Sequence, residues 1–349
     1  MKKFLCSFLT VILISQAILF TSCEKKDKYS SYSFDYFDTV TSITGYENSK
    51  EEFDAVSAEI MSLLEEYHKL FTIYDKYDGL NNLYTVNSLT NGTHSTVMVD
   101  QKIIDMLLFS KDMYQKTNGK VNVAMGSVLS IWHNYREQGI NDPSAAALPP
   151  MSLLEEAAQH TDIDKLIIDD ENNTVFLADD KMSLDVGAIA KGYAVEMVAN
   201  MLEEKSIVGY VINVGGNVRT VGMKADGEKW KVGIDDPYGS DDDPYYATLE
   251  INDMSLVTSG SYQRYYIVNG KNYNHIIDPD TLMPSDTFIS VSVLTESSAI
   301  ADALSTALFS MSFEEGKALI ENINDAEAMW ALSNGELKYS SGFSKFIVN

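Results

Sequence analysis

The segment Asp185–Gly192, which reads DVGAIAKG, constrains the fold of this chain more than any other stretch. It joins a short run ending in Asp185 to apolar residues at helical spacing, which predicts a strand, a glycine turn and a helix. A helix start offers free N–H groups and the positive end of the helix dipole, which suit an anionic ligand, and Lys191 could add a point charge for a phosphate. Ordinary packing of a strand against a helix uses such junctions too, so the segment alone leaves both interpretations open. The apolar positions of the helix are Tyr193, Val195, Val198, Met201 and Leu202.

The remaining pattern predicts an α+β fold with a mixed β-sheet core and packed helices, because helices and strands follow one another without a strict βαβ order. The acidic run 241–243 is expected to be a solvated loop. No internal repeat and no linker is visible after residue 34, so residues 34–349 are predicted to form one catalytic domain. Predicted helices cover 51–70, 101–116, 152–160, 298–311 and 313–323; predicted strands cover 36–46, 208–214 and 230–234, with hairpins at 166–177 and 329–339.

The N-terminus reads as a targeting segment rather than as part of the fold. Lys2 and Lys3 precede an apolar stretch over 4–20, and Thr-Ser-Cys follows at 21–23. Residues 1–22 are therefore predicted to be a lipoprotein signal peptide, with Cys23 as the lipidated residue and 23–33 as a polar tether. This places the protein on the extracytoplasmic side of a bacterial cell membrane, held by its lipid. Ordinary cleavage and an uncleaved anchor are the alternatives.

Composition excludes several classes of partner and chemistry. The formal net charge of −25 over 349 residues repels nucleic acid and anionic lipid headgroups. An anionic nucleotide would therefore need a local basic pocket or a metal ion. The sequence has no Walker motif, no G-x-G-x-x-G, no G-x-S-x-G and no zinc-type His/Cys cluster. Its two cysteines, Cys6 and Cys23, leave no disulfide for the mature chain.

The apolar helix near the C-terminus carries a second candidate site. Asp302, Ser305 and Thr306 share one face of it at i, i+3 and i+4. A buried carboxylate needs a cation or hydrogen-bond donors, and carboxylate and hydroxyl oxygens suit Mg²⁺. Alternatively, Asp302 accepts from nearby backbone N–H groups while the hydroxyls bond back to their own helix.

A third cluster combines TSGSYQRYY from Thr258 with NHIIDP from Asn274. The first piece offers hydroxyls and Arg264, and the second places His275 between a strand and a proline turn. Of five histidines, only His275 lies in a dense polar cluster. A catalytic or ligand-binding role and a structural role are both open for it.

Taken together, these segments resemble the ApbE family, the Mg-dependent FAD:protein FMN transferases. The resemblance covers about residues 34–323. It runs in order through the following pieces: Phe37-Asp38-Thr39, Trp132, DVGAIAKGYA from Asp185, VINVGGN from Val211, WKVGIDDP from Trp230, TSGSYQRYY from Thr258, HIIDP from His275 and ADALSTAL from Ala301.

The resemblance implies a metal and a nucleotide site. Asp185 and Lys191 would contact FAD. The main-chain carbonyl of Ala188 would hold Mg²⁺ together with the side chains of Asp302 and Thr306.

The resemblance also implies a flavin site and a base. His275 and Ile276 would lie beside the diphosphate, with His275 as the candidate general base. The residues implied to line the flavin site are Thr39, Ser130, Ile131 and Trp132. Two positions depart from the family pattern: Asn217 replaces an acidic residue, and Leu282 replaces a glycine in the turn after the histidine motif.

The implied activity is transfer of FMN from FAD onto a threonine hydroxyl of an exported or membrane flavoprotein, with release of AMP. Two alternatives remain at this stage. Water could replace the threonine, giving an FAD diphosphatase, or the protein could be a lipid-anchored flavin-binding protein without turnover. FAD, the acceptor flavoprotein and the membrane are the expected partners, and Mg²⁺ is the expected cofactor.

Overall fold

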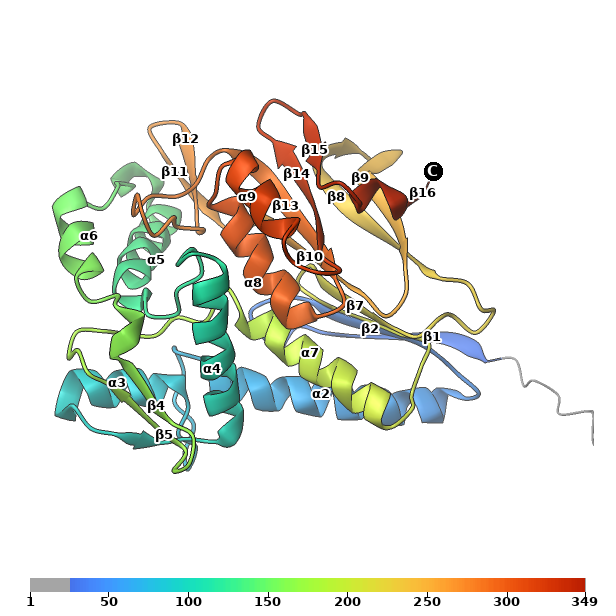
Figure 1. Ribbon diagram of the computed structural model, residues 1–349, viewed down its shortest axis with the longest axis horizontal. Coiled ribbons are helices and arrows are strands. Elements are labelled where there is room, and N and C mark those ends of the chain that lie inside the picture. Colours follow the sequence, from blue (N-terminus) through green and yellow to red (C-terminus); the bar gives the residue numbers. More distant parts are fainter. Residues whose placement is uncertain (1–25, 349) are drawn as a thin grey trace, which may run out of the picture.

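An eight-stranded sheet forms the centre of the protein (Figure 1). The computed structural model describes residues 26–348, so Cys23 and the predicted signal peptide lie outside the described residues. The α+β class is confirmed. The predicted mixed sheet is instead antiparallel, since every pairing between its strands runs that way. In spatial order its strands are β1 (Asp27–Ser33), β2 (Thr41–Glu47), β6 (Tyr210–Val214), β7 (Asn217–Val221), β10 (Ser255–Gly260), β13 (Phe288–Thr295), β14 (Glu327–Leu332) and β15 (Leu337–Tyr339).

The two faces of this sheet are covered differently. Helices α2 (Lys50–Phe71), α7 (Ala190–Glu204) and α8 (Ser298–Phe309) contact the sheet strands and share the large apolar core with them. A small sheet packs against the main sheet through a second apolar cluster, which includes side chains of the main-sheet strands that point away from the large core. Its strands are β8 (Trp230–Ser240), β9 (Asp243–Ile251) and β16 (Ile347–Val348). On β13, for example, Val293 belongs to the first core and Leu294 to the second.

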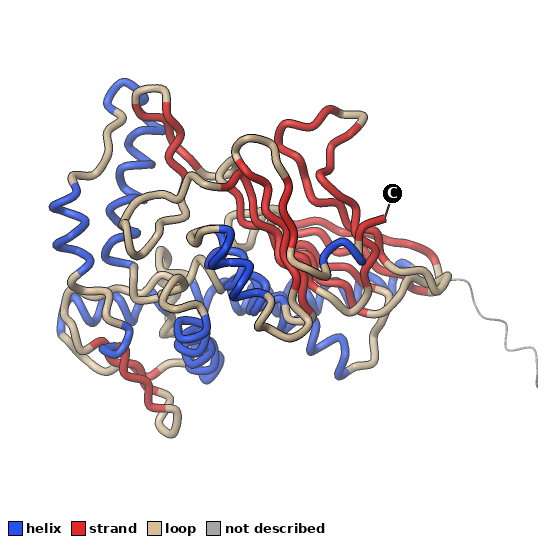
Figure 2. Tube along the Cα trace, turned by 45° about the horizontal axis from the view of Figure 1, so that its top comes forward, coloured by secondary structure: helices blue, strands red, loops and turns tan. Residues whose placement is uncertain are grey.

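A helical region flanks one end of the main sheet and appears at the left of Figure 1, while Figure 2 shows the main-sheet strands gathered on the other side. A third apolar cluster joins α5 and α6 to the hairpin of β11 and β12. The elements of this region are α3 (Leu83–Thr93), α4 (Gln101–Lys116), α5 (Gly126–Asn141), α6 (Met151–Ala158), β3 (Val97–Met98), β4 (Leu166–Asp169), β5 (Thr174–Leu177), β11 (Tyr265–Val268) and β12 (Lys271–Asn274); α9 (Phe313–Ile320) follows α8.

The predicted polar tether is wrong for most of its length. Residues Asp27–Ser33 form β1, which pairs with β2 at all seven positions. The segment reads as polar because β1 is an edge strand with one largely exposed face. Tyr29 turns inward and packs on Phe53, with 5.7 Å between ring centroids.

Most helices predicted from periodicity are confirmed, including α2, α4 and the helix after DVGAIAKG. Helices α3 and α5 and strands β7, β10 and β13 were not predicted. Strand β13 is buried at all eight positions, so it lacks the alternation that marks a half-exposed strand. The acidic run 241–243 lies at the tip of the β8–β9 hairpin, and Asp243 already belongs to β9.

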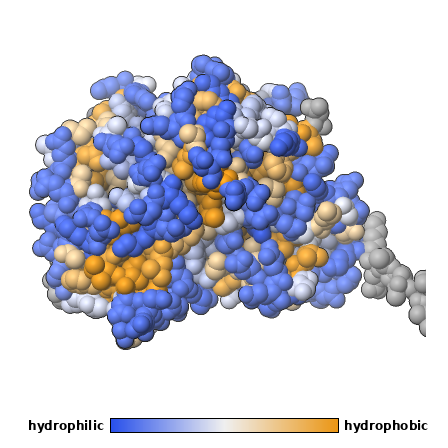
Figure 3. Space-filling model, in the orientation of Figure 1, coloured by the Kyte–Doolittle hydropathy of each residue, from blue (hydrophilic) through white to orange (hydrophobic). Residues whose placement is uncertain are grey.

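Hydrophilic residues dominate the face shown in Figure 3, as the acidic composition predicts. Among residues 26–348, no helix combines the length and apolar character needed to cross a membrane.

Helices α7 and α8 approach each other closely at Gly192. A Cβ atom there would lie 2.3 Å from the Cβ of Asp302 and 2.5 Å from the carbonyl oxygen of Ser298. Only glycine fits this contact, since real Cβ atoms do not approach other heavy atoms so closely. The glycine after Lys191 therefore sets the distance between the two helices that carry the candidate site.

Candidate active site

A cavity of about 560 Å³ lies where the main sheet meets the helical region. Its size is typical of a site for a cofactor-sized ligand. Segments far apart in the sequence line it, from Phe37 to Thr306. Of the residues proposed from the sequence, those lining the cavity are Thr39, Trp132, Asp185, Ala188, Lys191, His275, Ile276, Asp302 and Thr306.

Ser130 and Ile131, by contrast, do not line the cavity. Both lie on α5, which presents Leu129, Trp132, His133 and Arg136 to the cavity at helical spacing. Ser130 is exposed and donates to the carbonyl of Ser127 at 3.0 Å. Ile131 packs in the apolar cluster shared with the β11–β12 hairpin. The prediction took 130–132 as one segment facing the flavin, but successive residues of a helix point to different sides.

The Asp302 carboxylate is 3 % exposed and is held by α7 rather than by its own helix. Its Oδ2 accepts from the backbone N–H of Gly192 at 2.7 Å, and its Oδ1 lies 3.6 Å from Nζ of Lys191. Burial raises the pKa of Asp302, while Lys191 and the Gly192 N–H oppose that rise. Ser297 caps α8, so Asp302 is not needed as its cap.

The hydroxyls on α8 behave differently from each other. Ser305 donates to the carbonyl of Asp302 at 3.0 Å, as the structural alternative predicted. Thr306 lines the cavity and contacts Ser259 on β10, with 3.4 Å between the hydroxyl oxygens. Asp302 and Thr306, which both carry side-chain oxygens, therefore both line the cavity.

The Ala188 carbonyl supplies a third oxygen. In a regular helix the N–H of Gly192 would donate to it, but this N–H donates to Asp302 instead. Within the described chain this carbonyl accepts no hydrogen bond from a backbone N–H. Ala188 lines the cavity beside Lys191. The local distortion at the start of α7 thus frees a carbonyl next to a buried carboxylate.

This oxygen set suits a hard cation that keeps several waters. No group of three or more His, Cys, Asp or Glu side chains within residues 26–348 could hold a metal. A cation between α7 and α8 would instead have one carboxylate, one hydroxyl and one main-chain carbonyl. Oxygen ligands few in number and completed by water or phosphate are typical of Mg²⁺ sites.

His275 follows β12 directly and faces the cavity as a neutral ring. Burial, together with the charges of Arg264 and Arg136, lowers its pKa to about 4. Its Nδ1 lies 3.2 Å from the carbonyl oxygen of Arg264. A neutral ring that donates from Nδ1 keeps a lone pair on Nε2, which suits a proton acceptor.

The cavity gathers cationic side chains although the whole chain is strongly acidic, and the carboxylates of Asp38, Asp185 and Asp302 line it as well. Lys120, His133, Arg136, Lys191 and Arg264 all line it. This is the local basic pocket that an anionic nucleotide requires in a chain of net charge −25. Sequence reasoning missed Lys120, His133 and Arg136, because no motif marks the segments that bring them here.

Asp185 also lines this cavity and is held by the turn that follows it. Its Oδ1 accepts from the N–H of Gly187 at 2.9 Å, and its own N–H donates to the carbonyl of Val123 at 2.8 Å. Burial raises the pKa of Asp185.

Thr39 is positioned by an unusual stretch of backbone. Phe37 and Asp38 have φ values of 56° and 51°, a conformation that side chains disfavour. The N–H of Phe37 donates to Nδ1 of His68 at 3.2 Å. Gly215 passes so close that a Cβ there would lie 2.4 Å from Oγ1 of Thr39. The backbone here is shaped to present Thr39 to the cavity.

The two departures from the family pattern have visible consequences. Asn217 is fully buried and accepts from the Ser298 hydroxyl at 2.5 Å. Leu282 adopts φ 59°, the left-handed conformation that glycine accepts most easily. Its carbonyl accepts from Nε1 of Trp132 at 3.0 Å. The turn after the histidine motif therefore keeps a glycine-like backbone without the glycine.

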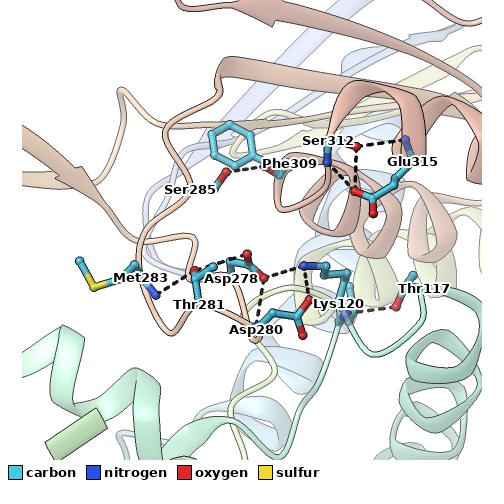
Figure 4. A network of polar contacts seen from close by, with 11 residues as sticks. Thr117, Lys120, Asp278, Asp280, Thr281, Met283, Ser285, Phe309, Ser312 and Glu315 are labelled. Atoms are coloured by element: carbon cyan, nitrogen blue, oxygen red, sulfur yellow. Dashed lines mark hydrogen bonds and ion pairs between the residues drawn. The ribbon is translucent and has the colours of Figure 1, made fainter. Parts of the chain in front are cut away.

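Figure 4 shows how the same turn is tied to the segment that carries Lys120. Lys120 Nζ lies 2.7 Å from Oδ1 of Asp278 and 2.8 Å from Oδ2 of Asp280. The Lys120 and Asp278 side chains are only 14 % and 15 % exposed, so this pair is shielded from water. The segment that carries Lys120 thereby fixes the turn that follows His275.

Replacing Lys120 by methionine is expected to destabilise the protein by about 2 kcal/mol, because the largely buried Asp278 carboxylate then has no positive partner. Lys102→Met is the matched control. Its partner Glu66 is well exposed, with side-chain exposures of 36 % and 45 % for the pair. The control should change the free energy of unfolding by less than about 0.5 kcal/mol. Urea unfolding measures both, and equal losses would contradict the assigned role of Lys120.

Comparison with known proteins agrees with this geometry. The model of the ApbE family matches residues 37–330. An FAD:protein FMN transferase of Klebsiella pneumoniae is 29% identical over 82% of this chain and 85% of its own length. The FAD:protein FMN transferase of Escherichia coli K12 is 26% identical over 98% of both chains.

Solved structures agree as well. The ApbE protein of Thermotoga maritima superposes with a TM-score of 0.79 at 25% identity, over 93% of this chain and 100% of that one. A mutant of the flavin transferase ApbE from Vibrio cholerae gives a TM-score of 0.75 at 25% identity, over 92% and 99%. The sequence match and the shared fold together place this chain in the ApbE family.

Proposed function

We propose that this protein is an FAD:protein FMN transferase, which moves FMN from FAD onto a threonine hydroxyl of an acceptor flavoprotein and releases AMP. One observation carries the proposal. A single cavity is lined by Ala188, Asp302 and Thr306, whose oxygen atoms suit a hard cation, together with Lys191 and His275. The relatives named above carry the same activity in their names.

Ala188, Asp302 and Thr306 would hold Mg²⁺, the cation that their oxygen atoms suit. When bound, the ion neutralises charge on the FAD diphosphate as it is cleaved. Lys191 lies 3.6 Å from Asp302, so it reaches both the metal site and a phosphate placed there. Arg264 and Arg136 extend the positive surface toward His275.

Residues of this chain accept the proton of the acceptor threonine and orient the flavin. The acceptor threonine oxygen forms a bond to the phosphorus of the FMN half, and the bond from that phosphorus to the AMP phosphate oxygen breaks. Nε2 of His275 takes the threonine proton. Apolar wall residues, among them Phe71, Val257 and Ile276, shield the flavin from water and fix its orientation.

Two other activities fit parts of the same cavity. Water in place of the threonine would make the protein an FAD diphosphatase that yields FMN and AMP. A lipid-anchored protein that only binds flavin would need no base. A neutral histidine beside the arginines favours a reaction that removes a proton, and the names of the relatives favour transfer over hydrolysis.

Incubation with FAD, Mg²⁺ and a threonine-containing acceptor protein distinguishes these activities. We expect a mass increase on the acceptor that equals covalent FMN. Asp302→Asn should lower the transfer rate at least about 100-fold, because it removes the only carboxylate assigned to the metal. Asp112→Asn, in an exposed ion pair on α4, should leave the rate unchanged. Free FMN and AMP without labelled acceptor would point to hydrolysis, and unchanged FAD to binding alone.

The pH dependence of kcat/KM tests His275 as the base. Only the neutral ring accepts a proton, so lowering its pKa extends activity to lower pH. With a pKa of about 4 instead of 6.5, the rate should stay near its pH 7 value down to about pH 5 and fall as pH passes through 4. Circular dichroism at each pH separates titration from acid unfolding. An acidic limb centred at 6.5 would contradict the role of the arginines.

We also propose that Cys23 carries a lipid that holds the enzyme on the extracytoplasmic side of a bacterial membrane. The order of charged, apolar and small residues before Cys23 supports this. An anchor would raise the local concentration of membrane-bound acceptors. In cells fed labelled palmitate, the wild-type protein should be labelled and Cys23→Ala should not. Equal labelling of both would refute the lipid site.

A further inference from the structure

A chain of hydroxyl groups runs from the cavity into the contact between β10 and α8. The hydroxyl oxygens of Thr306 and Ser259 lie 3.4 Å apart, and those of Ser259 and Ser305 lie 2.8 Å apart. Ser305 in turn donates to the main-chain carbonyl of Asp302 at 3.0 Å. Ser259 is half-buried and lines the cavity, whereas Ser305 is fully buried.

The main-chain carbonyl of Asp302, at the inner end, determines the direction of the hydrogen bonds in this chain of hydroxyls. A carbonyl oxygen can only accept, so the single proton of Ser305 is used on Asp302. With that proton used, the oxygen of Ser305 accepts from Ser259 at 2.8 Å, and the oxygen of Ser259 is left to accept from Thr306 across the longer contact of 3.4 Å. Each hydroxyl has one proton to give, so the order of donors is fixed from Thr306 inward.

This direction determines what Thr306 offers to the cavity. Its proton points to Ser259, so its lone pairs are left for another partner. A hydroxyl free to rotate could instead point its proton toward a cation, which would repel it. Outer groups that orient ligands in this way commonly change metal affinity 10–100-fold when they are removed.

We propose that Ser259 is a positioning residue that holds the Thr306 hydroxyl with its lone pairs facing the metal site. The inference rests on the proposed function, since it takes Asp302, Thr306 and the Ala188 carbonyl as the Mg²⁺ ligands. It assigns a role to a hydroxyl of the segment Thr258-Ser259-Gly260, for which the sequence analysis gave no specific function. Ser259 does not touch the metal in this scheme and acts only through Thr306.

The neighbouring residue provides a matched control. Thr258 is also half-buried, lines the same cavity and carries a hydroxyl on β10. That hydroxyl pairs with Ser292 on β13 at 2.8 Å, outside the chain that leads to Thr306. Thr258→Ala therefore removes the same kind of group from the same strand without breaking the order of donors.

Calorimetric titration of Mg²⁺ into the full-length protein tests the proposal without using activity. Ser259→Ala should bind Mg²⁺ about 10-fold more weakly than the wild type, while Ser259→Thr and Thr258→Ala should bind like the wild type. Thr306→Ala should lower the affinity at least as much. Ser259→Ala added to Thr306→Ala should cost nothing further, because the group it orients is gone. FAD binding in the presence of EDTA, followed by flavin fluorescence, should be the same in all variants.

Several outcomes would overturn the inference. Wild-type affinity in Ser259→Ala would show that Thr306 needs no orientation, and would leave the transferase proposal intact. Equal losses in Ser259→Ala and Thr258→Ala, or additive losses with Thr306→Ala, would mean general damage to the cavity. A wild-type protein that does not bind Mg²⁺ would refute the metal site itself, and the inference with it.

Discussion

The hydrogen bond from the Gly192 N–H to Asp302 is the contact on which the rest of the site depends. It satisfies a buried carboxylate that would otherwise cost several kcal/mol. It also leaves the carbonyl of Ala188, a residue that lines the cavity, without that backbone donor. Both effects require α7 and α8 to touch at a residue without a side chain. One close helix contact thus creates two of the three oxygen ligands proposed for the metal.

The cationic side chains in the cavity and the acidic surface of the protein have different electrostatic effects. The excess of carboxylates discourages binding of polyanions over the whole surface, while four lysine and arginine side chains are gathered at one place that can take an anion. Lys120 shows that these side chains also hold the cavity together. Its contacts to Asp278 and Asp280 join the segment before α5 to the turn after His275. The charges that favour a nucleotide therefore also fix the walls around it.

Motifs with their own local geometry could be found from the sequence, and surfaces made by tertiary packing could not. The helix start at Asp185–Gly192 and the polar face of α8 each follow from residue spacing, and both lie at the cavity. The strand predicted before Asp185 is wrong, because Ser183 makes only an isolated bridge with Met125 there. The sequence did not show that Ser130 and Ile131 lie outside the cavity lining, because α5 has a weak apolar stripe and its start at Gly126 carries no side-chain cap. Without a predicted helix there was no basis for choosing Trp132 and Arg136 as the inward face. Strand β13 was not predicted because it is buried on both faces and therefore shows no alternation of polar and apolar residues.

Strained backbone and ligand-facing side chains are coupled throughout the cavity. Phe37, Asp38 and Leu282 all adopt left-handed conformations that cost of order 1–3 kcal/mol each. Each is held by a side chain that lines the cavity: His68 accepts from Phe37, Arg264 donates to the Asp38 carbonyl at 3.2 Å, and Trp132 donates to the Leu282 carbonyl. A ligand that engages Arg264 or Trp132 therefore acts on the backbone that these side chains restrain. Substituting either one would therefore change the shape of the cavity together with its chemistry.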